Sequence, residues 1–385
     1  AVVWRSMQSV SQFISHTKDD GACEEGPSYW GHAAGKLFDY LDLLRMATGG
    51  VVNLNAEPKI RAMGHYIVDA LVGNDWAVNF ADATARYNDN NAALIYRYGV
   101  ACKDDDMVQT ALRLAAKGKD TAAQGTDLWR RLMALRDDAD LHGTTTDSTT
   151  DRRDYCKAYE ATGQYYMRSG SMCVAVKGGH NGESHNHNDV GSCCVYVNNV
   201  PMVIDVGAGT YTRQTFGPDR YNLWYTQSQY HNTPIINGQQ QKAGSRYRAT
   251  CVTVDTAAMS VTQDLAAAYD AAAACRHWYR SYRLNGDGLL VTDSFDINHP
   301  KEAHQLVFMV RGHIEVSADG LVSLRVDDQQ ALLHYDTRRL TALIDTIKLD
   351  DARQSNIWGD TIYRLRLVAR HKRPTDVYHV RITAE

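Results

Sequence analysis

The spacing of apolar residues changes near residue 150, and this change limits the folds that the chain can adopt. Before it, apolar residues recur at helical intervals in 40–46, 60–72 and 107–116, and glycine follows each run. Beyond it, short apolar runs such as 164–168 and 172–177 have a period of two and are separated by Gly, Asn and Asp turns. The sequence therefore predicts an α+β chain in which stacked helical hairpins precede an antiparallel β-sandwich.

The segment 136–152 is polar and rich in Thr and Asp, which is typical of a boundary between domains. The chain has 385 residues, more than one ordinary compact domain needs. We therefore expect a helical domain over 1–140, a linker over 141–160 and a β-sandwich over 161–385. Residues 1–10 already have the pattern of a helix interior, so we expect that a segment precedes residue 1.

Charge and composition exclude some classes of function. The formal net charge of −4 leaves no basic footprint, so we expect no nucleic-acid partner, although a local cluster of Arg and His can still bind an anionic substrate. No apolar run reaches the roughly 18 residues of a membrane-spanning helix, so no membrane span is expected. The eight cysteines include no Cys-x-x-Cys pair, which argues against a cysteine zinc site. The sequence leaves a homo-oligomer open.

The densest group of chemically active side chains lies in 180–189, where three histidines and two carboxylates fall within ten residues. On an extended strand, His185, His187 and Asp189 would project to one face. Imidazoles on one face suit a zinc ion, and they equally suit proton transfer near neutral pH. The alternative for a His-x-His pair is a surface loop without a chemical function.

Two later residues extend this group. Asp205 follows an apolar strand, where a carboxylate is costly to bury unless it is paired or bound to a metal. The alternative is that Asp205 caps the turn at 207–209. His231 adds another imidazole, so that His187, Asp205 and His231 would form a His₂Asp zinc set with space for a further ligand.

Arg220 and Tyr221 lie between these segments in the sequence. A guanidinium group suits a bidentate clamp on a substrate carboxylate, and Tyr221 is a candidate for sugar binding. A structural ion pair is the alternative for Arg220.

Five short motifs in this chain match those of one enzyme family. Three lie in the second half: Gly-His-Asn-x-x-x-His-x-His-Asn-Asp-x-Gly-Ser at 179–192, Ile-Asp-x-Gly at 204–207, and Tyr-His-Asn-Thr-x-x-Ile-Asn-Gly at 230–238. The other two are Glu-Gly-x-x-Tyr-Trp at 25–30 and Asn-Phe-Ala-Asp at 79–82. Together they resemble polysaccharide lyases of the heparinase II/III type, a group that includes alginate and oligoalginate lyases.

The resemblance implies both a fold and a reaction. The fold is an α/α toroid of helical hairpins, incomplete in this chain, followed by a multi-sheet antiparallel β-sandwich. The reaction is β-elimination on a uronic-acid polysaccharide, either a glycosaminoglycan or alginate, which gives an unsaturated uronate product. Such an enzyme neutralises the uronate carboxylate, removes the proton at C5 and protonates the leaving oxygen at C4. A polymer substrate in turn implies a periplasmic or secreted protein.

The resemblance also implies roles for individual residues. Tyr29 would act as the base, the acid or both, and His185 as the second proton-transfer residue or as the residue that faces the carboxylate. A phenol is a poor base at neutral pH, so Tyr29 needs neighbouring cations or histidines; otherwise it is a packing aromatic. We expect zinc to be mainly structural, with His187, Asp205 and His231 as ligands. The expected substrate-binding residues are Arg220, Tyr221, Glu25 and His32, which follows Tyr29 by one helical turn.

One expected element and two rival functions stay open. We find no counterpart of the family's carboxylate-neutralising Asn or His before Glu25, so we expect it upstream of residue 1. The first rival is a non-catalytic carbohydrate-binding protein on the same scaffold. The second is a zinc-dependent hydrolase, which predicts saturated products and loss of turnover on metal removal. No Glu or Asp general base accompanies the expected ligands, which argues against the hydrolase.

Overall fold

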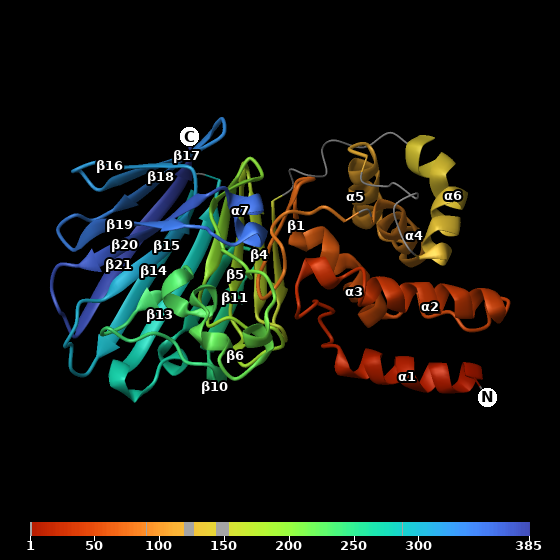
Figure 1. Cartoon of the computed structure of the whole chain (residues 1–385), viewed down its shortest axis with the longest axis horizontal. Coiled ribbons are helices and arrows are strands. Elements are labelled where there is room, and N and C mark those ends of the chain that lie inside the picture. The colour runs from red at the N-terminus through yellow and green to blue at the C-terminus, as the bar shows by residue number, and fades with distance from the viewer. Residues whose placement is uncertain (1, 90, 119–126, 144–153, 287) are drawn as a thin grey trace. The chain divides into compact units, whose positions relative to one another are not determined.

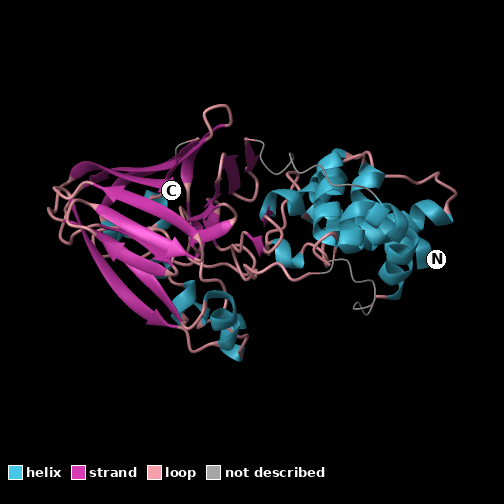
Figure 2. Cartoon of the chain, turned by 90° about the horizontal axis from the view of Figure 1, so that it is seen from above, coloured by secondary structure: helices cyan, strands magenta, loops and turns pink. Residues whose placement is uncertain are grey.

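A computed structural model describes residues 2–89, 91–118, 127–143, 154–286 and 288–385. The chain divides into two units. The helical unit consists of Ala1–Val78 and Arg86–Asp151, and the β unit consists of Asn79–Ala85 and Arg152–Glu385. Figure 1 follows the chain by colour from one end to the other, and Figure 2 distinguishes its helices from its strands.

The helical unit has six α-helices among its described residues. Three of them contain the predicted helical runs, because apolar side chains at helical spacing bury one face of each helix. Local signals set some of the ends: Pro58 opens the third helix, and the Asp104 side chain accepts a hydrogen bond from the Met107 amide at the start of the fifth. The elements are α1 (Val2–His16), the 3₁₀ turn η1 (Pro27–Tyr29), α2 (Ala34–Ala47), α3 (Pro58–Ala70), the short strands β1 (Leu71–Val72) and β2 (Trp76–Ala77), α4 (Ala92–Cys102), α5 (Asp105–Ala115) and α6 (Leu128–Gly143).

Aromatic packing holds the helical unit together. The rings of Phe38 and Tyr98 stack with their centroids 4.3 Å apart, and both side chains are fully buried. Gly64 makes room for this pair, since a Cβ atom there would come within 2.9 Å of the Tyr98 ring. Trp30 is also buried, and its indole N–H donates to the Met63 carbonyl at 2.8 Å. Trp30 therefore anchors the end of η1 to α3 and helps to fix the backbone of the neighbouring Tyr29.

The β unit contains two large antiparallel sheets. The nine-stranded sheet has the order β19-β20-β15-β8-β7-β5-β4-β3, with β9 paired to β15, and the eight-stranded sheet has the order β11-β12-β13-β14-β21-β18-β17-β16. The strands of the first are β3 (Tyr155–Tyr159), β4 (Gln164–Ser169), β5 (Met172–Lys177), β7 (Cys193–Val197), β8 (Val200–Val203), β9 (Pro234–Ile235), β15 (Gln305–Val310), β19 (Leu340–Lys348) and β20 (Thr361–Ala369). Those of the second are β11 (Thr250–Asp255), β12 (Ser260–Asp264), β13 (Cys275–Asn285), β14 (Gly288–Ile297), β16 (His313–Val316), β17 (Leu321–Val326), β18 (Gln329–Tyr335) and β21 (Thr375–Ala384). A small third sheet pairs β6 (His180–Asn181) with β10 (Gly244–Arg248), and α7 (Ala352–Trp358) connects β19 to β20.

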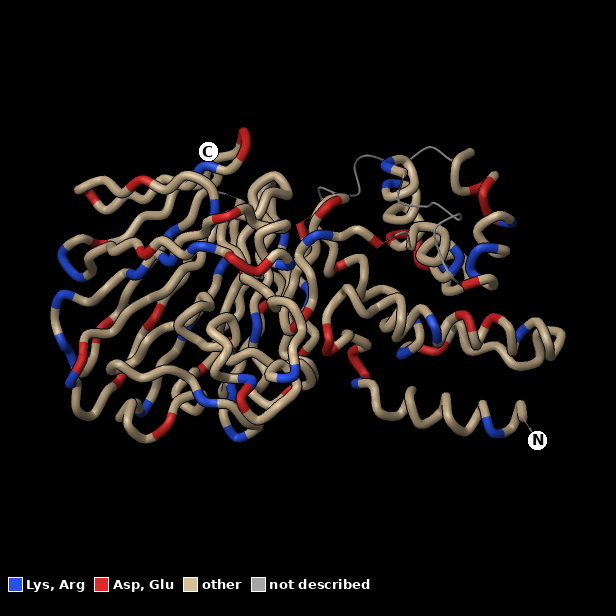
Figure 3. The backbone as a smooth tube through the Cα atoms, viewed as in Figure 1, with Lys and Arg blue, Asp and Glu red and all other residues tan. Residues whose placement is uncertain are grey.

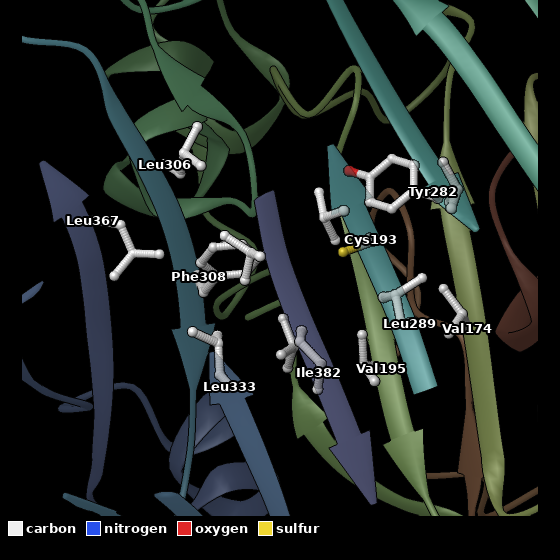
Figure 4. Close-up of a cluster of buried hydrophobic side chains, with 14 of the residues drawn as sticks. Val174, Cys193, Val195, Tyr282, Leu289, Leu306, Phe308, Leu333, Leu367 and Ile382 are labelled. Atoms are coloured by element: carbon white, nitrogen blue, oxygen red, sulfur yellow. The ribbon is translucent and has the colours of Figure 1, made fainter. Parts of the chain in front are cut away.

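One hydrophobic core joins the two large sheets, as expected for a sandwich. Figure 4 shows Val174, Cys193 and Val195 of the nine-stranded sheet near Leu289 and Ile382 of the eight-stranded sheet, and all five are buried. Alternating side chains of each strand enter this core, which is why the apolar residues have a period of two in the sequence.

Several turns form where the sequence predicts them. Gly170 adopts a left-handed backbone, with φ of 55°, between β4 and β5. Asn198 and Asn199 do the same between β7 and β8, with φ of 47° and 66°, as a tight two-residue hairpin turn requires.

The domain limits differ in two places from the expected ones. β3 begins at Tyr155, inside the span expected to be a linker, and Asn79–Ala85 belongs to the β unit although it lies within the expected helical domain. The rest of the expected linker over 141–160 includes 144–153, which lie outside the described residues. The local pattern of apolar and polar residues does not predict that Asn79–Ala85 belongs to the β unit, because its contacts are with residues far along the chain.

Two features concern the chain as a whole. None of the helices in the described ranges is long and apolar enough to cross a membrane. Acidic and basic residues are interspersed in both units, in keeping with the small net charge (Figure 3).

Candidate metal centre

The segment that carries the histidine cluster is a loop, not a strand. Between β6 and β7 the chain forms turns and bends, and His185 has a left-handed backbone with φ of 55°. The expectation that His185, His187 and Asp189 share the face of an extended strand is therefore wrong. His185 keeps 24% of its side chain exposed, whereas His187 and Asp189 are each 1% exposed as residues. The loop thus separates one accessible histidine from a buried group.

His187, Asp205 and His231 come together from three separate segments. One ligand atom of each lies within 4.8 Å of the others, and all three residues are buried. Asp205 follows β8, and His231 ends the 3₁₀ turn η6 (Ser228–Tyr230). The His231 Nδ1 atom donates to Asp205 Oδ2 at 2.9 Å. Asp205 also accepts the Gly207 amide at 2.9 Å, so it both joins the cluster and caps the turn that the sequence offered as an alternative.

This arrangement suits a zinc ion. His187 Nδ1 and His231 Nε2 are buried and have no hydrogen-bond partner among the described residues. Two imidazole nitrogens and a carboxylate are typical zinc donors, and a shared position between them would satisfy the orphaned nitrogens. Burial by itself raises the pKa of Asp205, but His231 and His187 outweigh this effect and lower it. The carboxylate that a cation requires is therefore charged.

Asp82 connects this cluster to the exposed histidine. Its side chain is fully buried and accepts hydrogen bonds from His185 Nδ1 at 2.8 Å, His187 Nε2 at 3.2 Å and Arg220 Nη2 at 2.8 Å. Burial acts to raise the pKa of Asp82, but His187 and Arg220 lower it well below its usual range. A carboxylate that holds the far nitrogen of a metal-binding histidine is a common outer partner of metal sites. Asp82 ends the Asn-Phe-Ala-Asp motif at 79–82, and the motif by itself indicates no role for this residue.

Two further contacts fix the segment that carries Asp82. The Asn79 side chain donates to the Asp205 carbonyl at 3.0 Å, and Arg353 Nη2 in α7 donates to the Asp82 carbonyl at 3.0 Å. Because these contacts join residues far apart in the sequence, spacing alone does not predict them.

The buried Arg220 side chain donates hydrogen bonds to backbone carbonyls of the histidine loop. Nε donates to the Asn186 carbonyl at 3.0 Å, Nη1 to the Thr215 carbonyl at 3.0 Å, and Nη2 to the His185 carbonyl at 2.8 Å as well as to Asp82. The guanidinium is thus committed to internal acceptors, which corresponds to the structural ion pair and not to the expected clamp on substrate.

Tyr221 lies beside the same loop as a partly buried residue. Its hydroxyl accepts a hydrogen bond from Asn186 Nδ2 at 3.5 Å, next to His185. The expected role of Tyr221 in sugar binding stays a prediction.

The remaining expected site residues belong to the helical unit. Gly26 has φ of 89° at the start of η1, a backbone that glycine accepts without strain, and Tyr29 ends this turn as a partly exposed residue. Glu25 is also partly exposed, and His32 is exposed. The His32 amide donates to the Tyr29 carbonyl at 2.9 Å, so both lie within one turn. The approach of Tyr29 to His185 stays a prediction.

Comparison with known proteins places this geometry in a family. The family described as heparinase II/III-like, C-terminal, matches residues 151–372. A search of curated proteins found no match. The fold is similar to a heparinase III gene product with methylated lysines (TM-score 0.71, 14% identity, 98% of this chain and 54% of that one) and to heparan sulfate lyase HepC from Pedobacter heparinus (0.69, 13%, 97% and 54%). It is also similar to a Paenibacillus xanthan lyase (0.54, 12%, 94% and 40%).

At these identities the structural likeness establishes the fold, and the chain spans about half of the length of the heparinase III and HepC structures. The matched region contains the predicted ligands His187, Asp205 and His231, together with His185 and Arg220. The chain belongs to the heparinase II/III-like family.

Proposed function

We propose that this chain is part of a polysaccharide lyase that cleaves a uronic-acid polysaccharide by β-elimination. The observation that carries the proposal is the Asp82–His185 pair. A fully buried carboxylate holds Nδ1 of a histidine whose side chain remains 24% exposed, and the same carboxylate holds a residue of the candidate metal centre. A histidine fixed in this way is suited to proton transfer at a surface where a polymer can bind.

In the proposed reaction, the base removes the proton from C5, the C4–O bond breaks, and a C4=C5 double bond forms. The proton for the leaving oxygen comes from the acid. Asp82 fixes the Nδ1–H tautomer of His185, so Nε2 is the atom that exchanges a proton or faces the uronate carboxylate. By family resemblance, the Tyr29 hydroxyl is the second proton-transfer group.

The proposed cofactor is one zinc ion held by His187, Asp205 and His231. When bound, it would cross-link three loops and keep His187, and through it Asp82, in place. Proton transfer by His185 and Tyr29 does not itself require the metal.

The substrate that we propose is a glycosaminoglycan or alginate. Two structural neighbours are named heparinase III and heparan sulfate lyase, and a third is named xanthan lyase. We further propose that helices α1–α6 form part of an α/α toroid and that the protein acts in the periplasm or outside the cell, where such polymers occur. Glu25, His32 and Tyr221 are the proposed substrate contacts.

A panel of uronate polysaccharides tests the proposal. The chain is incubated with heparan sulfate, chondroitin sulfate, hyaluronan and alginate, and the ultraviolet absorbance of the unsaturated uronate is followed. Absorbance that grows with time on at least one polymer supports a lyase. If saturated fragments form and their formation stops on chelation, the protein is the zinc hydrolase instead. Tight binding without any cleavage indicates a carbohydrate-binding protein.

A further inference from the structure

Asp189 is a buried carboxylate without a hydrogen-bond donor. It is 1% exposed, and neither Oδ1 nor Oδ2 has a partner within the part of the chain that the structure describes. Burial of such a carboxylate is costly, because water no longer solvates it and no protein group replaces the water, and burial accordingly raises the pKa of Asp189. Such a group calls for an explanation, and a bound cation is one of the common ones.

The backbone around Asp189 is firmly held. The Asn188 amide donates to the Thr226 carbonyl at 2.9 Å, and the Ser192 amide donates to the Asp189 carbonyl at 2.9 Å. The position of the Asp189 backbone is therefore set by the fold of this loop, and its side chain is buried.

The surroundings of Asp189 are those of the candidate metal centre. The positive charges of Lys177, His231 and His187 act to lower the pKa of the Asp189 carboxyl, and the negative charge of Asp205 acts to raise it. The Lys177 ammonium group, however, donates its hydrogen bonds to the Glu183 carboxylate and to the Gly178 carbonyl. The lysine is thus already paired with a carboxylate, and the remaining neighbours all belong to the metal cluster.

We infer that Asp189 is the second carboxylate of the metal centre. It lies outside the set His187, Asp205 and His231, whose ligand atoms are within 4.8 Å of one another, and it balances the charge of the ion together with Asp205. Two carboxylates and two neutral imidazoles make the buried group electrically neutral when a dication is bound. The orphaned atoms of Asp189, His187 and His231 then have a common explanation. This inference rests on the zinc centre of the proposed function and adds a residue that the expected ligand set lacked.

The test compares zinc binding by Asp189→Asn with the unaltered protein. Zinc affinity is measured by competition with a chelator, and thermal unfolding is measured with zinc and after its removal. Because loss of an outer or direct partner of a metal site typically costs about 10- to 100-fold in affinity, we expect that reduction here. We also expect the zinc-dependent rise in Tm to shrink, while the chelated variant is at least as stable as the chelated unaltered protein, since an amide of the same shape replaces a carboxyl group that has no hydrogen-bond partner among the described residues.

Asp42→Asn is the matched control. Asp42 is a 3% exposed carboxylate in α2 that is not a member of the metal cluster. Its Oδ2 has no hydrogen-bond partner among the described residues, and its Oδ1 accepts a hydrogen bond from Arg45 Nη2 at 2.8 Å. This variant should leave zinc affinity unchanged. If Asp189→Asn does not fold, Asp189→Ser removes the same charge with a smaller side chain and is measured in its place.

Three results would overturn the inference. Unchanged zinc affinity in the variant shows that Asp189 does not serve the ion. An equal loss of stability with and without zinc shows that its charge serves Lys177 instead. If the unaltered protein binds no zinc, the metal centre itself is wrong, whatever the outcome with the polysaccharide panel, so the failure of this inference is distinct from failure of the lyase proposal.

Discussion

At the scale of single residues, the loop 182–192 contains one accessible histidine, His185, and one buried histidine, His187. His185 has a left-handed backbone, and its Nδ1 atom donates a hydrogen bond to the buried Asp82. We expect His185→Ala to lower the rate of unsaturated-uronate formation by roughly 10²- to 10⁴-fold, because a positioned proton-transfer group is removed. The rate is measured on the best polymer of the panel.

His277→Ala is the control for this variant. His277 also donates Nδ1 to a buried carboxylate, Asp264, at 2.7 Å, but it lies on β13 and is 54% exposed. It should keep near-normal turnover. Equal activity of the two variants would mean that His185 takes no part in the chemistry.

Asp82 is a positioning residue, and its loss should affect two properties at once. In Asp82→Asn, His185 and His187 lose their shared charged acceptor, so we expect both turnover and zinc affinity to fall by about 10- to 100-fold. Asp264→Asn removes the matching acceptor of His277 and should change neither. A fall in turnover with unchanged zinc affinity contradicts the shared role of Asp82.

The sequence predicted part of this site and missed part of it. His187, Asp205 and His231 could be proposed as a set because zinc donors have a recognisable chemistry and each lies beside turn residues. Asp82 could not be assigned a role, since its partners are 103 and 105 positions away. The internal use of Arg220 was equally hidden, because a guanidinium group looks the same in a sequence whether it faces a substrate or a carbonyl group.

At the scale of elements, α3 and α4 pack closely because Gly64 in α3 has no side chain and leaves room for the Tyr98 ring of α4. In Gly64→Ala the new Cβ would meet the Tyr98 ring at 2.9 Å, and the buried ring has little room to move. We expect the free energy of unfolding to fall by about 1–3 kcal/mol, as is typical of overpacking. Denaturant unfolding followed by circular dichroism measures this loss.

Gly143→Ala provides the comparison, because nothing lies within 4 Å of a Cβ atom at that end of α6. It should alter stability by no more than about 0.5 kcal/mol. A similar loss in both variants would show that the close contact with Tyr98 is not the cause.

A partly buried ion pair between α3 and the start of α5 makes the helical unit sensitive to pH. His65 Nδ1 donates to Asp104 at 2.8 Å, and Nε2 lies 3.7 Å from Asp69. Burial acts to lower the pKa of His65, but the hydrogen bond with Asp104 and the nearby Asp69 carboxylate outweigh it and raise the pKa from 6.5 to about 10. The folded state therefore keeps this proton at a pH where the unfolded chain has lost it.

The stabilisation by protonated His65 is accordingly complete below pH 6.5 and is lost as the pH rises towards about 10. We expect His65→Gln to cost about 1–3 kcal/mol at pH 6 and much less near pH 10. Unfolding is followed by helical circular dichroism at both values. His16→Gln, an exposed residue in α1, should show no such dependence; a pH-independent cost of His65→Gln would contradict the assignment.

Elements with strong local signals were predictable from the sequence. The hairpins at Gly170 and at Asn198–Asn199 have turn residues that accept a left-handed backbone, and the helical runs have a clear period. β3 was placed in the linker because its pairing with β4, not its own composition, makes it a strand.

At the scale of the whole molecule, the proposed reaction requires residues from both units. Tyr29→Phe keeps the shape of the side chain and removes its hydroxyl, so activity should collapse while folding survives. If Tyr29 and His185 act in one elimination step, the double variant should be hardly slower than the slower single variant, because residues that act as a unit are strongly non-additive. Rates of the two single variants and the double variant measure this.

Tyr247→Phe serves as the control, since Tyr247 lies on β10 and has its hydroxyl bonded to Arg246. It should retain activity and combine additively with His185→Ala. Near-normal turnover of Tyr29→Phe would remove Tyr29 from the mechanism.

The seven residues Asn79–Ala85 make both units discontinuous in the sequence. They leave the helical half, deliver Asp82 to the β unit, and return to the helices, so the β half as a continuous stretch from Arg152 lacks the carboxylate on which two of its histidines and Arg220 depend. The two halves are therefore not interchangeable modules. A β half taken from a relative, starting at the position of Arg152, would therefore also need the matching short insert to supply the carboxylate of Asp82.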